Sequence, residues 1–583
     1  MGDITKFQAW WKEAYDAEEV WRRKARANRL MYVGKQWDAL DLDILRKEGR
    51  PALTINKIFP LINFLQGYQI QNRQDITVIN RKGSTKAEAE ILTECIRHLI
   101  DTNSGDNEIS SMFIDGIITG RGFISGLVSF DDDPINGDLL LQRFNPLQIY
   151  LDPKGERYDL SDCGYIIKSV WYTMDRLRAE FPSKADEIGR GYAESGEVQF
   201  RGYGEQDEYE KNSGGIGGLH DSQVLVKEIW YKTDAEVHYV LLPDGSVNAI
   251  RDEEQARALA DSVPGSAIKT RRQDVLNLAS IVGDVTLQDT ERPFEEFNAY
   301  PFVGFFPYRM DKDEDIDDPF IGVIDNLVDL QKEVNKRRSQ QLNIINTMAH
   351  SGWLNKQQAG AKSSELEHFG SSPGAVINYE EVPPIQITPK APSQAHLLTE
   401  EKAATDMKET SGINPDLLGY RGERGEPGVV LQMRQQQGSI ILEGMLNNLR
   451  RSQRILGSIL VGLITKSGLY TAAEVSNIID ITSNPEKQMA VEALFINPDL
   501  KRFDVLVATQ PTSPSQRQMN FYKMAEMAKS GLPIPPEVMV KAADLPYSDE
   551  ILAYIQQMKA AQGAPAGPSL EGALGGEQAP PGV

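Results

Sequence analysis

The sequence is poor in the residue types that metal centres and disulfides require. Its 583 residues include two cysteines, Cys95 and Cys163, and six histidines. The cysteines lie far apart and match no metal-ligand spacing, so two reduced thiols in a cytosolic compartment are the simplest expectation. The histidines are scattered and share no ligand spacing. We therefore expect no metal and no cofactor.

Motifs of common enzymes and of membrane proteins are also missing. The sequence has no Gly-x-x-x-x-Gly-Lys-Ser/Thr phosphate loop, no His-Glu-x-x-His zinc motif and no Gly-x-Ser-x-Gly nucleophile turn. The best apolar run, residues 459–464, is far too short to span a bilayer, and the N-terminus shows no apolar signal region. From these absences we expect that the chain is neither an enzyme nor a membrane protein. Acidic residues are abundant, however, so composition leaves a metal-dependent nuclease open.

Basic residues are outnumbered. The chain has 62 Lys and Arg against 84 Asp and Glu, a net charge of −22. Such a chain is not expected to adhere to DNA or to an anionic membrane over its whole surface, so any contact with DNA must use local basic residues. A hydrophobic content of 40% and a charged content of 25% are typical of a folded, soluble protein. The length exceeds a single core and predicts three or more packed regions.

The most informative stretch begins at Asp318, an expected helix N-cap, with Pro319 at the first helical position. Nothing interrupts the helical pattern before Met348, and about thirty helical residues would span about 45 Å. The apolar stripe lapses over residues 335–341, which read Asn-Lys-Arg-Arg-Ser-Gln-Gln. A long helix with a polar middle is not expected inside a compact core. It should cross open space, line a channel or pack against copies of itself.

The chain after this helix predicts a small lobe between two helices. Short strands are expected over residues 375–379 and 385–388, and the next helix over 394–410. Residues 412–428 are rich in glycine and in alternating charges, which predicts a flexible, exposed loop. A second long helix is expected over 429–465, and its four glycines favour a kink.

The N-terminal 310 residues predict an α+β region with antiparallel strands that are neighbours in sequence. Helices are expected over 7–33, 87–100, 108–119 and 252–262, and strands over 76–80, 123–130, 139–144, 224–231 and 237–242. Asn136 and Gly137 favour a hairpin turn, because this pair tolerates left-handed backbone geometry. A late strand is expected over 505–508.

An acidic cluster precedes the long helix. It comprises Asp311, Asp313, Asp315, Asp317 and Asp318. The cluster suggests a calcium loop, but the turn glycine at the sixth loop position is absent and Gly322 stands where a bidentate glutamate is needed. The favoured interpretation is an acidic surface loop whose charge suits a helix N-terminus.

Four sequence motifs occur in a characteristic order. They are Tyr32-Val33-Gly34-Lys35-Gln36-Trp37, Gly49-Arg50-Pro51-Ala52-Leu53-Thr54-Ile55-Asn56, Asn145-Pro146 with Leu151-Asp152-Pro153, and Asp318-Pro319-Phe320-Ile321-Gly322. They are accompanied by the order long helix, small lobe, helix, exposed loop and long helix. In these features nearly the whole chain resembles the portal proteins of tailed double-stranded DNA bacteriophages, of the type found in short-tailed phages.

The resemblance implies an α+β portal fold with wing, stem, clip and crown regions. It assigns residues 1–310 to the wing, 311–350 to a first stem helix, 351–392 to the clip, 393–412 to a second stem helix, 413–428 to a tunnel loop, 429–515 to a long wing helix and the completion of the wing, 516–560 to crown helices and 561–583 to a disordered tail. Portal proteins form a ring, usually of twelve subunits, at one capsid vertex.

The resemblance also implies partners. The ring would assemble in the host cytoplasm with the major capsid and scaffolding proteins and would then reside in the virion. Double-stranded DNA would be packaged through it by the terminase large subunit, retained, and later ejected. The clip would dock the terminase and then the head-completion or tail adaptor proteins.

The implied site residues lie on the tunnel loop and on the first stem helix. The DNA-facing loop residues are Tyr420, Arg421, Glu423, Arg424 and Glu426, and the stem residues are Lys332, Lys336, Arg337 and Arg338. The stem cations would line the channel or lie between subunits, and pairing with acidic residues of the adjacent subunit remains open. Sparse cations suit a conduit, because every phosphate contact would slow sliding DNA. A metal-dependent nucleic-acid enzyme and a capsid adaptor without a DNA conduit remain as alternatives.

Overall fold

The computed structural model describes residues 3–509 and a scatter of positions between 521 and 555. The gaps before 509 are 131–136, 185–186, 188–222, 244–246, 251, 295–296, 312, 314–315, 317, 350–351, 358–359, 370–375, 380, 388–393, 413–439, 480–484 and 496–502. Contacts divide the chain into two compact units, one of residues 1–70 and 75–508 and one of residues 71–74 and 509–583. The elements described below lie almost entirely in the first unit.

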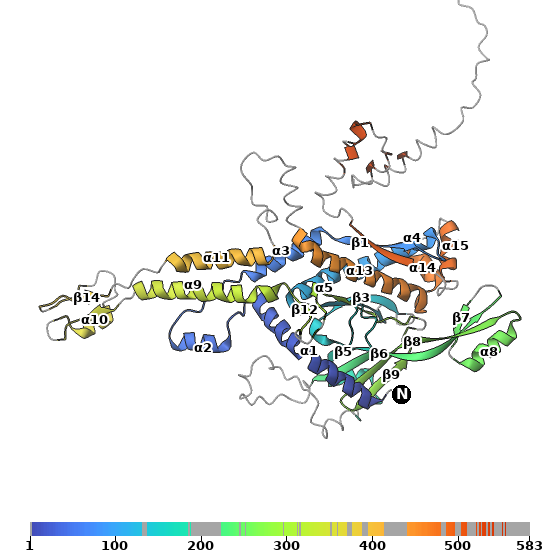
Figure 1. Ribbon diagram of the computed structural model, residues 1–583, viewed down its shortest axis with the longest axis horizontal. Helices are drawn as coiled ribbons and strands as arrows, with labels where there is room; N and C mark the ends of the chain where they lie inside the picture. The colour runs from blue at the N-terminus through green and yellow to red at the C-terminus, as the bar shows by residue number, and fades with distance from the viewer. Residues whose placement is uncertain are drawn as a thin grey trace, which may run out of the picture. The chain divides into compact units, whose positions relative to one another are not determined.

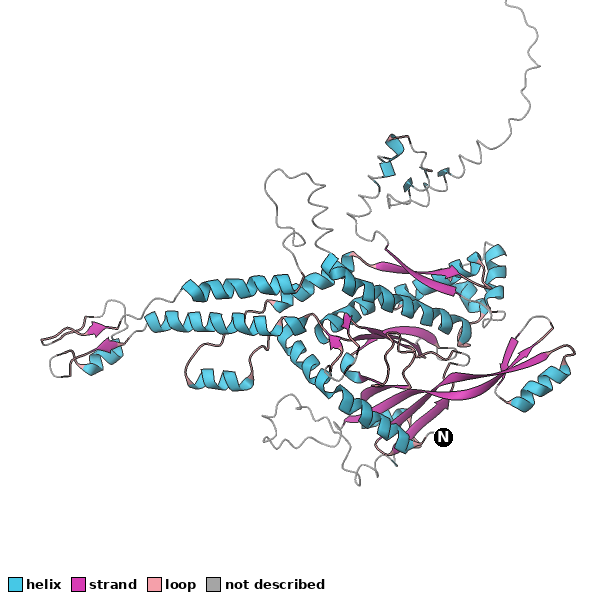
Figure 2. Ribbon diagram, viewed as in Figure 1, coloured by secondary structure: helices cyan, strands magenta, loops and turns pink. Residues whose placement is uncertain are grey.

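The chain combines helices with antiparallel sheets, as expected of the predicted α+β class (Figures 1 and 2). The helices are α1 Ile4–Tyr32, α2 Ala39–Lys47, α3 Ile58–Gln71, α4 Lys86–Thr102, α5 Gly105–Thr119, α6 Met174–Glu180, α8 Glu253–Ser262, α9 Val328–Ala349, α10 Ser363–Phe369, α11 Gln394–Thr410, α13 Ile440–Lys466, α14 Ala472–Ile478 and α15 Pro485–Leu494, with short 3-10 turns η1 Pro146–Gln148 and η2 Ile324–Asn326. The strands are β1 Gln74–Asn80, β2 Gly122–Ser129, β3 Asp138–Phe144, β4 Ile149–Leu151, β5 Tyr165–Thr173, β6 Gln223–Leu241, β7 Val247–Ile250, β8 Ala267–Val282, β9 Val285–Glu291, β10 Phe302–Phe305, β11 Tyr308–Arg309, β12 Phe320–Ile321, β13 Trp353–Leu354, β14 Ile385–Gln386 and β15 Phe503–Thr509.

The largest sheet is antiparallel, with strand order β4-β5-β6-β8-β9 and with β7 paired to the end of β6. The prediction of two strands over 224–231 and 237–242 was wrong, because β6 is one strand of 19 residues. The intervening residues stay extended because each pairs with β8, from Tyr231 opposite Asn277 to Val237 opposite Arg271. Cross-strand pairing outweighs the polar local sequence there.

A smaller sheet, β10-β2-β3, contains the predicted hairpin, with Phe123 opposite Phe144 and Ser129 opposite Asp138. Helices α5 and α13 pack on this sheet. The glycines of α13 do not interrupt the helix, which runs continuously from Ile440 to Lys466. A Cβ atom at Gly462 would lie 2.5 Å from the ring of Phe297, whereas Gly444 has open space around its Cβ position. Gly462 is therefore a close-packing position.

A buried ion-pair cluster joins α1 to the strands. The Glu18 carboxylate accepts hydrogen bonds from Arg121 Nη1 at 2.6 Å, from Arg22 Nη2 at 2.9 Å and from the Leu151 amide at 3.0 Å. The Arg121 guanidinium lies 3.9 Å from the centroid of the Trp21 ring and 3.9 Å from that of the Phe320 ring. All three charged residues of the cluster are buried, so each charge depends on its partner for stabilisation.

The predicted start of the long helix at Pro319 was wrong, because α9 begins at Val328. Asp318 accepts a hydrogen bond from the Phe320 amide at 3.0 Å, so it caps a turn. The following residues form β12, which pairs with β11, and the Val323 amide donates to the Ile117 carbonyl at 2.8 Å. These tertiary backbone bonds displace the first helical turns. The 22 residues of α9 span about 33 Å instead of 45 Å.

The lobe between α9 and α11 also differs from its prediction. The expected strand at 385–388 exists as β14, and its partner is β13. The described part of the expected strand at 375–379 holds one isolated bridge, between Tyr379 and Ala361. Helix α10 was not expected. The predicted crown helices, over most of residues 516–560, and the predicted tail at 561–583 lie outside the described residues.

Candidate functional site: the helical stalk

Helices α9 and α11 form a two-helix projection, here called the stalk. They lie side by side and run in opposite directions, with the lobe of β13, α10 and β14 at the far end (Figures 1 and 2). Ala403 and Met407 of α11 are buried in the stalk, and Arg338 of α9 forms an ion pair with Glu400 of α11 at 3.3 Å. The predicted helix at 394–410 is confirmed to the residue.

One face of α9 binds an extended segment of the same chain, residues 53–57. Three α9 side chains, which we call the polar ladder, accept hydrogen bonds from alternate backbone amides of this segment. The bonds run from Leu53 N to Ser339 Oγ at 2.9 Å, from Ile55 N to Asn335 Oδ1 at 2.9 Å, and from Lys57 N to Gln331 Oε1 at 2.8 Å.

The spacing of the polar ladder explains why this pairing works. Four helical residues rise about 6 Å, and two extended residues advance about 6.6 Å. Side chains at positions i, i+4 and i+8 of a helix can therefore meet every second amide of an extended strand. Two ladder side chains also donate hydrogen bonds. Gln331 Nε2 donates to the Ile55 carbonyl at 2.8 Å, and Asn335 Nδ2 donates to Gln36 Oε1 at 2.7 Å.

The polar ladder accounts for part of the lapse in the apolar stripe of α9. Asn335 and Ser339 lie in the lapse and Gln331 one turn before it, and all three are buried. The lapse suggested a helix facing open space, a channel or other copies. For this face the structure shows instead that the polar groups bind the chain's own backbone. The motifs at residues 32–37 and 49–56, which carry the resemblance to portal proteins, both meet α9 here through Gln36 and Leu53.

The four stem cations form ion pairs within the same chain. The pairs are Lys332 with Asp38 at 3.3 Å, Lys336 with Asp41 at 3.2 Å, Arg337 with Glu333 at 2.7 Å and Arg338 with Glu400 at 3.3 Å. Lys336 and Arg338 are about half exposed, and such pairs contribute about 0.2–1 kcal/mol each. The cation of such a weak pair can exchange its carboxylate partner for another anion at a small cost in free energy. Their role towards DNA or a neighbouring subunit stays a prediction.

Two thiols and one carboxylate outside the stalk are buried titratable groups. Within the described residues, no three His, Cys, Asp or Glu side chains gather as metal ligands. Burial raises the pKa of both thiols, Cys95 and Cys163, to about 12, which leaves them protonated at neutral pH. Burial also raises the pKa of Asp115, and hydrogen bonds from Arg143 oppose that shift.

The acidic cluster at 311–318 is described only in part. Asp318 accepts from the Phe320 amide and pairs with Lys24, so its carboxylate has structural partners. Asp315 and Asp317 lie outside the described residues. So do all the predicted DNA-facing residues of the tunnel loop, which are Tyr420, Arg421, Glu423, Arg424 and Glu426.

Sequence reasoning missed the polar ladder as a unit. The signal was present, because Gln331, Asn335 and Ser339 recur every four residues along α9. Their common face could have been recognised from that period. Their partner could not, since residues 53–57 lie some 280 positions away in the chain and carry no complementary pattern of side chains. They contribute backbone amides, which every non-proline residue has.

Comparison with known proteins gives one result over nearly the whole length. A family model described as Phage P22-like portal protein matches residues 8–580. No curated protein sequence matches the chain. Among the helices of the described residues, none combines the length and the apolar character needed to cross a bilayer.

Proposed function

Since the chain belongs to the phage P22-like portal protein family, we propose that it forms a closed ring at one capsid vertex, through which double-stranded DNA is packaged, retained and later ejected. Family membership supports the portal role and a place in the capsid. The ring of twelve copies, the passage of DNA and the individual partners are the proposed part.

The observation that carries the proposal is the stalk with its terminal lobe. Two antiparallel helices hold a small, separate lobe away from the two sheets, which is the arrangement expected of stem helices and a clip. In a ring, a bundle of such stalks would surround a channel and present the lobes together as a collar. The collar would dock the terminase large subunit during packaging, and head-completion or tail adaptor proteins afterwards.

The polar ladder supports the same role by stiffening the stalk. A stem must hold its shape while DNA is driven past it. The ladder fixes α9 to residues 53–57 through buried hydrogen bonds, each contributing about 1 kcal/mol net and costing more if one partner is lost. The wing and the stem would then move as one body, so that force applied at the clip reaches the capsid-facing part of the subunit.

The strong negative charge of the chain suits a conduit. Each phosphate contact adds salt-sensitive affinity, and a ring multiplies every contact by the number of its copies. A net charge of −22 per chain limits such contacts to a few basic positions. We assign the transient contacts to the tunnel loop, residues 413–428, through Arg421 and Arg424. Tyr420, Glu423 and Glu426 would set the loop's contact surface and its local charge.

The stem cations are assigned a second, weaker role. Lys332, Lys336, Arg337 and Arg338 would line the channel or bridge neighbouring stalks by exchanging their present partners. Their ion pairs within the chain are also compatible with a purely structural role. Replacing all four cations with Gln distinguishes the two roles. If the role is structural, the substitutions change thermal stability alone, whereas in a channel role they also change packaging.

The test of the proposal is packaging by particles that carry variant portals. Replacing Arg421 and Arg424 with Ala should reduce packaged or retained DNA while leaving ring assembly intact. The matched control is Arg176→Ala with Arg178→Ala on α6, which removes the same charge from an exposed surface helix. Normal packaging and retention by the loop variant would remove the tunnel loop from the mechanism. Rings that assemble without any axial channel would favour a capsid adaptor instead.

A further inference from the structure

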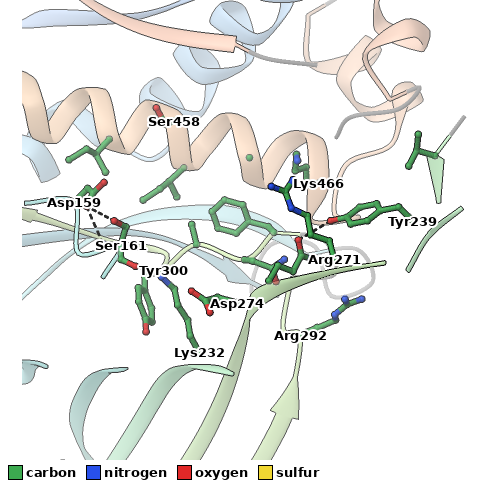
Figure 3. A pocket seen from close by; sticks show the side chains of 18 of the residues that line it. Asp159, Ser161, Lys232, Tyr239, Arg271, Asp274, Arg292, Tyr300, Ser458 and Lys466 are labelled. Atoms are coloured by element: carbon green, nitrogen blue, oxygen red, sulfur yellow. Dashed lines mark hydrogen bonds between the residues drawn. The ribbon is translucent and has the colours of Figure 1, made fainter. Parts of the chain in front are cut away.

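A basic cleft lies between the large sheet and α13. It has a volume of about 1110 Å³ and is lined by the far ends of β6 and β8, by β7, and by the C-terminal half of α13. Figure 3 shows the cleft with Ser458 and Lys466 on the helix side and with Lys232, Tyr300 and Asp274 on the opposite side. The cationic residues that line it are Lys232, Lys269, Arg271, Arg292, Arg454 and Lys466.

The cleft is positively charged, although the chain as a whole is negatively charged. Six cations face two acidic residues, Asp159 and Asp274, in a protein whose net charge is −22. Some of these cations have partners, since Arg454 lies 3.4 Å from Asp504 and Lys232 donates to the Ser161 carbonyl at 2.6 Å. The excess of positive charge remains and predicts an anionic occupant.

The opposite face of the same end of the sheet is acidic. Tyr239 and Leu241 of β6 line the cleft, so the alternating residues His238 and Val240 face the other side, where both are buried. Helix α8 packs against this end of β6 and β8 and lies on the side away from α13 (Figure 1). It buries Ala256 and exposes acidic residues outward.

The exposed face of α8 carries more acids than bases. The acids are Asp252, at the N-cap, with Glu253, Glu254 and Asp261, all exposed. The single base of the helix, Arg257, pairs with Glu253. One end of the sheet therefore presents an acidic face and a basic face on its two sides.

We propose that the basic cleft receives the acidic face of α8 from the adjacent copy of the chain. The inference rests on the proposed ring. A cyclic ring repeats one heterologous contact, in which one face of each copy meets a different face of the next at the same height and radius. The acidic and basic faces lie on the two sides of the same end of the large sheet. They would therefore have the same height and radius in every copy of the ring. The contact would also offset the repulsion between neighbours that each carry −22.

The apolar part of the cleft lining favours a protein occupant over DNA. Leu241, Val247 and Ile455 contribute accessible apolar surface to the cleft. A duplex backbone offers phosphates and no apolar groups to cover such a surface. A helix such as α8 offers both carboxylates and aliphatic side-chain stems. DNA binding in the cleft is therefore the rival outcome of the test.

The test is a charge exchange on the full-length chain, followed by mass photometry across a range of concentrations. Lys269→Glu with Arg271→Glu reverses the cleft, and Glu253→Lys with Glu254→Lys reverses α8. Each pair alone should raise the concentration of half-assembly about tenfold, since several exposed pairs are turned from attractive to repulsive. All four changes together should restore assembly. The matched control for the cleft variant is Lys86→Glu with Arg178→Glu, which lowers the net charge by the same amount on α4 and α6.

A covalent trap checks the contact directly. Glu254→Cys and Lys269→Cys in one chain place thiols on opposite faces of the sheet, so a disulfide between them must join two copies. Mild oxidation should give a ladder of linked subunits on a non-reducing gel, and the native thiols are buried and stay out of the reaction.

Three outcomes would overturn the contact. In the first, rings form, but the two introduced cysteines give no cross-link and the fourfold variant does not restore assembly. This result refutes the α8 contact and leaves the proposed function standing. The second is a cleft variant that assembles normally but no longer binds a 30-base-pair duplex, which would make the cleft a DNA site. The third is a parent chain that forms no ring at any concentration, even in the presence of its scaffold, which would refute the proposed function and this contact with it.

Discussion

Removing the central side chain of the polar ladder should loosen the joint between the stalk and the rest of the subunit. Asn335→Ala deletes an acceptor for the Ile55 amide and a donor to the buried Gln36 carbonyl oxygen. Each partner left unsatisfied costs about 1–3 kcal/mol. The substitution also gains a few tenths of a kcal/mol in helix propensity. Two partners are left unsatisfied, so the net loss of local stability is about 2–5 kcal/mol.

Hydrogen–deuterium exchange measures this loss where it occurs. A peptide covering residues 52–58 reports the amides of Leu53, Ile55 and Lys57. If these amides exchange through local opening, a loss of about 2–5 kcal/mol raises their exchange rate about 30-fold to about 4,000-fold, because about 1.4 kcal/mol corresponds to a factor of ten. A global unfolding midpoint is a poorer readout, because a chain of this size need not unfold in two states.

Gln340→Ala is the matched control for this experiment. Gln340 follows Ser339 on α9 but is exposed, so its truncation removes a polar side chain without breaking the ladder. Its exchange rates at residues 52–58 should stay within a factor of about two of the parent protein. Equal exchange in Asn335→Ala and in the parent would refute the ladder as the joint between the stalk and residues 53–57.

Three further predictions concern the folded subunit. Gly462→Ala should destabilise the protein by about 1–3 kcal/mol, because its Cβ would overlap a buried phenyl ring, whereas Gly444→Ala should be stabilising by up to about 1 kcal/mol; thermal unfolding of the two variants compares them directly. Glu18→Gln should cost about 3–5 kcal/mol, since it leaves buried guanidinium groups without their counter-charge; an unfolding midpoint equal to that of the parent would contradict the buried pairing. Cys95 and Cys163 should resist iodoacetamide at pH 8 in the folded protein and react in urea. Because folding raises the pKa of each thiol from about 9 to about 12, the thiols' contribution to stability is complete below pH 9 and is lost as the pH rises towards 12.

The sequence predicted the elements whose pattern is local. Helix α11 and the hairpin of β2 and β3 were placed within a residue or two, because apolar periodicity and turn residues mark them. The order of the motifs led to the portal family, which the family match confirms. The mixed α+β character followed from the same patterns.

The errors arose where distant segments decide the conformation. Asp318 and Pro319 form a sound helix start locally, but pairing of β12 with β11 holds the next residues in a strand. The residues between the two predicted halves of β6 look like a turn until β8 pairs with them. The polar ladder was misread because its partner is the backbone of a remote segment. Tertiary hydrogen bonds outweighed local propensity in each case.

The most direct test of the proposed portal ring is the mass and shape of the purified protein, measured by mass photometry and negative-stain microscopy. Twelve copies of the 65.0 kDa chain would weigh about 780 kDa. The proposal predicts closed rings near that mass with a central hole and with projecting stalks on one side. A protein that stays monomeric at high concentration and in the presence of its scaffold, or that forms a closed assembly without an axial hole, would contradict it.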